Sequence, residues 1–127
     1  MPLVRVSLPA SMGFRAPHIG ESIHQAMMET INVPAGDRFQ IFTEHAPGTL
    51  IIDPAYPGME RSEQAILVQI TISSGRTVEM KKALFAKIVE RLARLPGMRK
   101  EDVFVNLVEV AKENWSFGNG IAQYAEK

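Results

Sequence analysis

A proline at the second position gives the chain a candidate reactive amine. The sequence begins MPLVRVSL, and methionine aminopeptidases remove Met1 when the next residue is as small as proline. Pro2 then carries a secondary α-amine, and the ordinary α-amino pKa of about 7.7–8.0 lies near neutral pH. The neutral amine is a base or a nucleophile, and the protonated amine polarises a carbonyl oxygen. The other interpretation is a stiff first residue of a strand, and Pro2 alone leaves both open.

Two charged residues stand at junctions between predicted elements. Asp37 comes directly before a strand, in the run GDRF, and Arg76 lies in SSGRTVE, between a strand and a helix. Helix N-terminal amides favour an anion and a guanidinium binds a carboxylate in a bidentate fork, so Arg76 is a candidate to hold an acidic substrate. A turn residue and an exposed cation are the alternatives. SSGRTVE matches neither glycine-rich phosphate-binding motif.

Aromatic residues gather near the C-terminal end, in NWSFGNGIAQY. Trp115 and Phe117 are two residues apart, so in an extended segment their rings face the same way. Such a pair beside glycines walls off an apolar pocket and strengthens the electrostatic interactions inside it. The alternative is a plug at the end of the hydrophobic core.

Composition argues against several classes of site and partner. The 127 residues contain no cysteine, and His18, His24 and His45 lack the spacing of metal ligands, so we expect no metal site. Lys and Arg equal Asp and Glu in number, which argues against nucleic acid or an anionic membrane as a partner. No apolar run reaches the length of a membrane span, and no secretory signal is recognisable. We therefore expect one cytoplasmic domain over residues 1–127.

The elements that must position these residues follow the same order twice. Alternating apolar residues predict strands, and apolar residues spaced by four predict helices. Each half of the chain is then a strand, a helix and a strand. The expected strands are 3–8, 38–44, 66–72 and 102–110, and the expected helices run from Pro17 to Ile31 and from the cap residue Thr77 to Leu95.

A short signature supports the interpretation of the two halves as copies. D-x-F-x-x-x-x-E occurs from Asp37 to Glu44 and again from Asp102 to Glu109. With the matching order of elements, it indicates a duplicated βαβ unit, in which each right-handed crossover makes the two strands parallel. The expected units span about residues 2–45 and 66–110, and the loop 46–65 joins them.

The predicted fold is α/β, or α+β in some schemes, with a four-stranded sheet and both helices on one face. The other face would stay uncovered, although apolar residues such as Phe104 and Val108 lie on the second side of the strands. Another copy of the chain is the simplest cover, so we expect an oligomer. The loop 46–65 is the alternative, since its Ile51 and Tyr56 also need burial.

Together these features resemble the tautomerase superfamily, and within it the malonate semialdehyde decarboxylase family. The resemblance runs nearly end to end. Its most specific parts are the MPL start, VPAGDRFQI at 33–41, SGRTVEMKK at 74–82 and WSFGNGIAQY at 115–124. It implies a homotrimer, a small carboxylic acid as substrate and no cofactor.

The resemblance also implies three catalytic residues. Pro2, after the loss of Met1, matches the family's N-terminal proline. Asp37 matches the acidic residue of its DR motif. Arg76 matches an arginine of the loop after the third strand, which binds the substrate carboxylate.

Four further residues complete the expected substrate-binding set. Trp115 and Phe117 match the residues of the family's apolar wall, and Phe39 and Ser74 lie beside the acidic and basic motifs. Ser74 stands where some relatives carry a second arginine. The resemblance therefore implies weaker carboxylate binding or a different preferred acid.

The implied activity is cofactor-independent decarboxylation of a 3-oxo acid such as malonate semialdehyde, with hydration of an acetylenic or unsaturated acid as a side reaction. Two alternatives stay open. One is keto–enol tautomerisation with neutral Pro2 as the base. This reaction differs from the decarboxylation in the charge that the Pro2 amine must carry. The other is a trimeric binding protein without catalysis.

Overall fold

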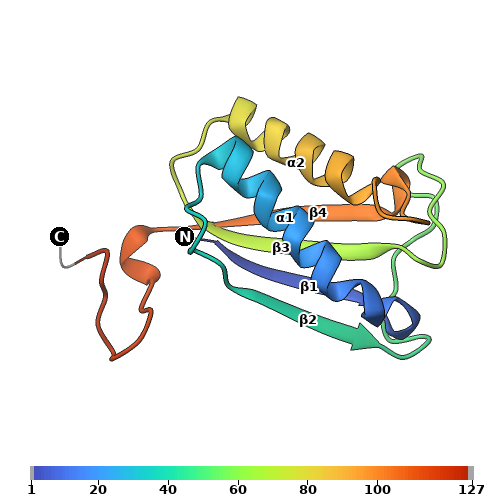
Figure 1. Cartoon of the computed structure of the whole chain (residues 1–127), viewed down its shortest axis with the longest axis horizontal. Coiled ribbons are helices and arrows are strands. Elements are labelled where there is room, and N and C mark those ends of the chain that lie inside the picture. The colour runs from blue at the N-terminus through green and yellow to red at the C-terminus, as the bar shows by residue number, and fades with distance from the viewer. Residues whose placement is uncertain (1, 126–127) are drawn as a thin grey trace.

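The structure, a computed structural model, describes residues 2–125 (Figure 1). Met1, whose removal the sequence predicts, lies outside these residues. The strands are β1 (Leu3–Pro9), β2 (Gln40–His45), β3 (Ile66–Ser73) and β4 (Val103–Val110), and the helices are α1 (Ala16–Ile31) and α2 (Val78–Leu92). Short 3-10 segments are η1 (Ala10–Arg15), η2 (Lys100–Asp102) and η3 (Lys112–Asn114).

The four strands form one sheet in the order β2-β1-β3-β4. β1 pairs with β2 and β3 pairs with β4 in parallel, while the central pair, β1 and β3, is antiparallel. Figure 1 shows α1 and α2 side by side on the same face of this sheet. The predicted duplicated βαβ units and the two-helix layer are thus confirmed.

Local interactions explain where the element boundaries differ from the prediction. β2 begins at Gln40 rather than at residue 38, and the side chain of Arg38, before it, forms an ion pair with Glu21 of α1 at 2.6 Å. α2 ends at Leu92 rather than Leu95, because the chain tightens into a turn in which the Leu95 N–H donates to the Leu92 carbonyl at 3.0 Å. The start of α2 is as predicted, with the Thr77 hydroxyl accepting from the Met80 N–H at 3.2 Å.

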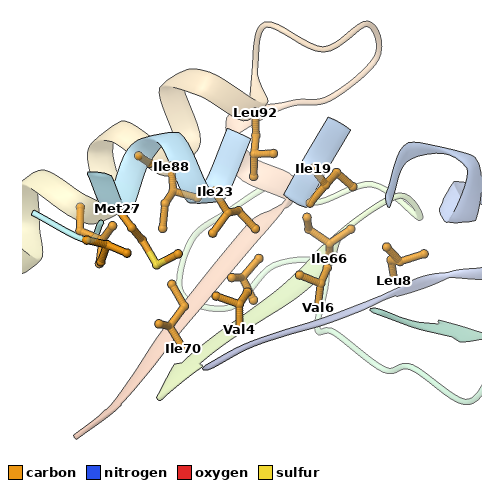
Figure 2. Close-up of a cluster of buried hydrophobic side chains, with 14 of the residues drawn as sticks. Val4, Val6, Leu8, Ile19, Ile23, Met27, Ile66, Ile70, Ile88 and Leu92 are labelled. Atoms are coloured by element: carbon orange, nitrogen blue, oxygen red, sulfur yellow. The ribbon is translucent and has the colours of Figure 1, made fainter. Parts of the chain in front are cut away.

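The core lies between the sheet and the two helices, as Figure 2 shows. Alternate residues of the central strands point into it, and so do the apolar stripes of the helices. Fully buried members are Val4, Val6, Leu8, Ile66 and Ile70 from the sheet, with Ile19, Ile23, Met27, Ile88 and Leu92 from the helices. Burial of each such side chain contributes about 1.5–3 kcal/mol, which holds the strand ends in place.

The second face of the sheet is left uncovered by the described residues of one chain. Phe104 is 43% exposed and Ile41 39% exposed, although both lie in strands. The loop 46–65 does not cover this face, and the burial expected for its apolar residues fails for Ile51 and Tyr56, which are 87% and 75% exposed. Another copy of the chain therefore stays the predicted cover.

Candidate active site

The strand register brings the predicted catalytic residues to one edge of the sheet. Because Leu3 pairs with Thr71 in the antiparallel pair, the start of β1 lies beside the end of β3. Because Val4 pairs with Gln40 in the parallel pair, the start of β1 also lies beside the start of β2. Pro2, which is buried, therefore stands next to the segment entering β2 and the loop leaving β3 (Figure 1).

Asp37 is held at this edge by the turn between α1 and β2. Its N–H donates to the Pro34 carbonyl at 3.0 Å, and its side chain is half-buried. His24 of α1, only 3% exposed, bonds the Ala35 carbonyl through Nε2 at 2.9 Å. Sequence reasoning considered His24 only as a metal ligand, whereas in the structure it fastens the turn that presents Asp37.

The neighbour of Asp37, Arg38, points away from this edge. Besides its ion pair with Glu21, it donates through Nε to the Gln40 side chain at 3.2 Å. Hydrogen bonds from Gln25 and Arg38 hold the pKa of the Glu21 carboxyl below its usual value. Arg38 thus braces the start of β2 against α1, and Asp37 lies next to it in the turn at the site edge.

Arg76 comes from the loop between β3 and α2. Its Nη1 donates to the Ser73 carbonyl at 2.9 Å, and the side chain is half-buried. This bond fixes the guanidinium over the end of β3 and leaves its other donors for a ligand. Gly75, with a φ of +125°, makes the turn that allows this approach.

The aromatic residues form one group at the same edge. The rings of Trp115 and Phe117 stack with centroids 5.7 Å apart, and Tyr124 meets Phe117 edge-on at 5.0 Å. Trp115 Nε1 donates to the Ser73 hydroxyl at 3.0 Å, which ties the group to the end of β3. The sequence predicted the Trp115–Phe117 pair, but Ser73 and Tyr124 were missed.

A pocket of about 760 Å³ opens beside Arg76. We call it the Arg76 pocket; its lining consists of Ser73, Ser74, Gly75, Arg76, Met80, Lys112 and Tyr124. Ser74 lies in the pocket wall, and its N–H donates to the Val110 carbonyl at 2.9 Å. Its role in substrate binding stays a prediction. The other predicted site residues are not in this lining: Pro2, Asp37, Phe39, Trp115 and Phe117. Phe39 is 47% exposed and meets β1 through its carbonyl, which accepts from the Val4 N–H.

The Arg76 pocket is electropositive. Arg76 and Lys112 line it, and no Asp or Glu of the described residues does. Such a site favours an anion, and a guanidinium suits a carboxylate. Residues 2–125 contain no group of three metal-ligating side chains, and none of their helices is long and apolar enough to cross a membrane.

Comparison with known proteins agrees with this arrangement. A family model described as a tautomerase enzyme matches residues 37–118. The chain belongs to the tautomerase superfamily. A probable tautomerase of Bacillus subtilis, YusQ, is 43% identical over 108 residues, which is 85% of each chain.

Two solved structures of this superfamily are close to the chain. One is the FG41 malonate semialdehyde decarboxylase inhibited by 3-bromopropiolate, with 38% identity, a TM-score of 0.90 and coverage of 98% of this chain and 95% of that one. The other is a malonate semialdehyde decarboxylase described by its decarboxylase and hydratase activities, with 30% identity, a TM-score of 0.88 and coverage of 98% and 96%. The chain is thus a cofactor-independent enzyme, a decarboxylase or a tautomerase, and the alternative of a binding protein without catalysis is dropped.

Proposed function

We propose that this tautomerase-superfamily enzyme decarboxylates a 3-oxo acid such as malonate semialdehyde, with Pro2 and Arg76 acting on the same substrate. The observation that carries the proposal is the shared sheet edge, where the start of β1 meets the loop that bears Arg76. The likeness to two malonate semialdehyde decarboxylases supports the choice of reaction.

Substrate binding begins with the carboxylate. Arg76 spends one donor on the Ser73 carbonyl and offers the remaining N–H groups to the acid. This contact holds the bond between the carboxyl carbon and the adjacent carbon out of the plane of the aldehyde carbonyl. Orbital overlap during cleavage of that bond requires this geometry. Trp115, which bonds Ser73 of the pocket wall, and Phe117, which stacks on it, are proposed to shield the carboxylate end from water once substrate is bound, which favours the neutral product carbon dioxide.

The amine of Pro2 supplies the electron sink. Protonated, it donates a hydrogen bond to the aldehyde oxygen; unprotonated, it attacks the carbonyl carbon, loses water and gives an iminium. In either case the bond between the carboxyl carbon and the adjacent carbon breaks, and its electron pair forms an enol or enamine. Carbon dioxide leaves, and protonation at carbon, followed by hydrolysis in the iminium route, gives acetaldehyde.

Asp37 has a role beside the amine. A carboxylate at this edge stabilises the charged form of Pro2 or orients a water molecule. The second task makes hydration of an acetylenic acid a side activity, and one of the neighbours is described by both decarboxylase and hydratase activities. Treatment of this enzyme with 3-bromopropiolate, the inhibitor bound to the other neighbour, should therefore add mass to the peptide that begins at Pro2.

Keto–enol tautomerisation is the second candidate, because the relative YusQ is named a probable tautomerase. In that reaction neutral Pro2 is the base, whereas protonated Pro2 serves the decarboxylase. The dependence of kcat/KM on pH separates the two. Activity that falls as the amine loses its proton supports the acid role, and activity that falls as it gains one supports the base role.

We also propose that the active form is a homotrimer. The exposed sheet face supports this, since it carries Phe104 and Ile41 on its outer strands, and apolar residues on a sheet are normally buried against another layer. The predicted cytoplasmic location and single domain stay predictions. Light scattering gives the mass of the assembly, and a monomer at working concentration would contradict the trimer.

The first experiment is a panel of 3-oxo acids, 2-hydroxydienoates and phenylpyruvate, run on protein whose intact mass shows the loss of Met1. Turnover of malonate semialdehyde to acetaldehyde supports the proposal. A chain that keeps Met1 and is nevertheless fully active would overturn it, because that chain has no prolyl amine.

A further inference from the structure

A second cation stands in the Arg76 pocket, and the reaction described above does not use it. Lys112 begins η3, directly after β4, while Arg76 follows β3. Since Ser73 of β3 pairs with Val110 of β4, the two segments leave neighbouring strands at the same edge. Two positive side chains from separate segments therefore line one pocket.

Within residues 2–125, neither cation is neutralised by an ion pair. Lys81 of α2 binds Glu109 at 2.8 Å, and Lys87 binds Glu90 at 3.1 Å, but no carboxylate lies within 4.0 Å of Lys112 or Arg76. Two like charges that share a pocket without an acid repel each other. A ligand with two negative charges relieves that repulsion.

The pocket is also larger than a three-carbon acid requires. Malonate semialdehyde has only three carbons, so it leaves part of this volume of about 760 Å³ free. Lys112, at the start of η3, is part of the pocket wall. A longer substrate thus fits in the pocket, and its far end can contact the positive charge of Lys112.

We propose that Lys112 makes this pocket selective for dianions, so that the preferred substrate is a 3-oxo dicarboxylic acid. Arg76 binds the carboxylate that is lost, and Lys112 binds the distal carboxylate. The chemical step is the one given above: the carbon–carbon bond breaks, carbon dioxide leaves, and a proton adds at carbon. The choice of substrate rests on the proposed function, whereas the recognition of a dianion does not.

Binding of unreactive acids tests the recognition alone. Glutarate and its half-amide, glutaramate, match in length and differ by one charge. Trp115, the one tryptophan of the sequence, reports binding by fluorescence because its indole N–H bonds Ser73 in the pocket wall. Since Lys112 is exposed, we expect glutarate to bind roughly fivefold more tightly than glutaramate, and added salt should reduce the difference.

The matched variants are Lys112→Met and Lys100→Met. Lys100 is an exposed lysine in η2, before β4 and therefore at the other edge, so its loss changes the net charge equally. Lys112→Met should abolish the preference for glutarate, Lys112→Arg should keep it, and Lys100→Met should leave it unchanged. Equal binding of the two acids by the wild type, or a preference that survives Lys112→Met, overturns the inference.

Turnover then separates this inference from the proposed function. We expect Lys112→Met to raise KM for a 3-oxo dicarboxylic acid and to spare KM for malonate semialdehyde. A preference for glutarate that depends on Lys112, without turnover of any 3-oxo acid, would refute the decarboxylase and keep the dianion site. Turnover of malonate semialdehyde with equal effects of Lys112→Met on both substrates would refute the dianion site and keep the decarboxylase.

Discussion

The two edges of the sheet are related by the duplication, yet within residues 2–125 the pockets found at them differ in charge. Residues Ser74 to Arg76 follow β3 at one edge, and Ala10 and Ser11 follow β1 at the other. A pocket of about 520 Å³ at that second edge is lined by Pro9, Ala10, Ser11, His45, Ala46, Pro47, Gly48, Leu50, Glu63 and Gln64. It contains Glu63 and, among the described residues, neither Lys nor Arg.

The two strand starts differ in the same way. Ala65 precedes β3 inside the chain, where its nitrogen is an amide, whereas Pro2 precedes β1 and becomes an amine once Met1 is lost. An amide nitrogen is neither a base nor a nucleophile. The duplicated fold therefore gives two similar edges, and the start of the chain together with Arg76 and Lys112 gives one of them its proposed chemistry.

The matching aspartates show the divergence most clearly. Asp102 is 2% exposed and accepts hydrogen bonds from the Ser62 N–H at 2.7 Å and the Ser62 hydroxyl at 2.6 Å. It fastens the end of the loop 46–65 to the start of β4. Asp37, its counterpart in the D-x-F-x-x-x-x-E signature, is half-buried at the opposite edge beside Pro2.

Replacement of the prolyl amine should have the largest effect. Pro2→Ala leaves a primary amine with a different pKa and shape, and we expect kcat/KM to fall by roughly 10²–10⁴, the range of general acid–base catalysis. Steady-state kinetics measures this, and circular dichroism checks that the fold is intact. Full activity in a folded variant would remove Pro2 from the mechanism.

The aspartate comparison predicts opposite losses at the two edges. Asp102→Ala leaves both Ser62 donors without an acceptor, so the free energy of unfolding should fall by about 2–4 kcal/mol. Asp37→Asn should lower kcat and change stability by less than about 1 kcal/mol. Urea unfolding at one protein concentration compares the variants, and equal destabilisation by both would erase the proposed distinction.

Replacing one arginine at each edge tests whether substrate binding depends on the edge that carries Arg76. Arg76→Ala should raise KM for acidic substrates by roughly ten- to a hundredfold, because it removes charged hydrogen bonds to the carboxylate. Arg99→Ala is the control, since Arg99 precedes β4 at the other edge and donates to the Glu60 carbonyl at 2.9 Å. An unchanged KM in Arg76→Ala would refute the anchoring role.

The smallest expected effect concerns the brace behind Asp37. The hydrogen bonds from Gln25 and from Arg38 lower the pKa of Glu21 in the folded state. The charged carboxylate therefore stabilises the fold above its unfolded pKa, and this stabilisation is lost as the pH falls through the folded pKa. For an exposed pair we expect roughly 0.5 kcal/mol. Between about pH 5 and pH 3, the free energy of unfolding of Glu21→Gln should therefore fall by that much less than the free energy of unfolding of the wild type. An equal fall in the two proteins would count against the stabilising role of Glu21.

Local patterns made the elements predictable, while the site depended on contacts between distant segments. Periodicity and the Thr77 cap act within a few residues, so the sequence shows them directly. Lys112 and Ser73 lie together in the pocket wall because β3 pairs with β4. Tyr124 lies there because the C-terminal segment folds back so that its ring contacts Phe117. Their places follow from register and tertiary packing, which no local spacing reveals.

The role of Phe39 in substrate binding stays a prediction. Phe39 stands two residues after Asp37 in the shared signature. In the structure it is outside the Arg76 pocket, as its counterpart Phe104 is, and both are more than 40% exposed. The repeat thus predicts that Phe39 and Phe104 occupy equivalent positions in the two halves. Their exposure suits contact with another copy of the chain better than substrate binding within one chain.

A crystal structure of the mature enzyme with malonate measures the central claim most directly, because malonate carries a carboxylate in place of the aldehyde. The account predicts one carboxylate on Arg76 and an oxygen of the other within about 2.6–3.2 Å of the Pro2 nitrogen, in the same chain or an adjoining one. Malonate bound away from Arg76, or a Pro2 nitrogen out of hydrogen-bond reach of it in every copy, would contradict the account.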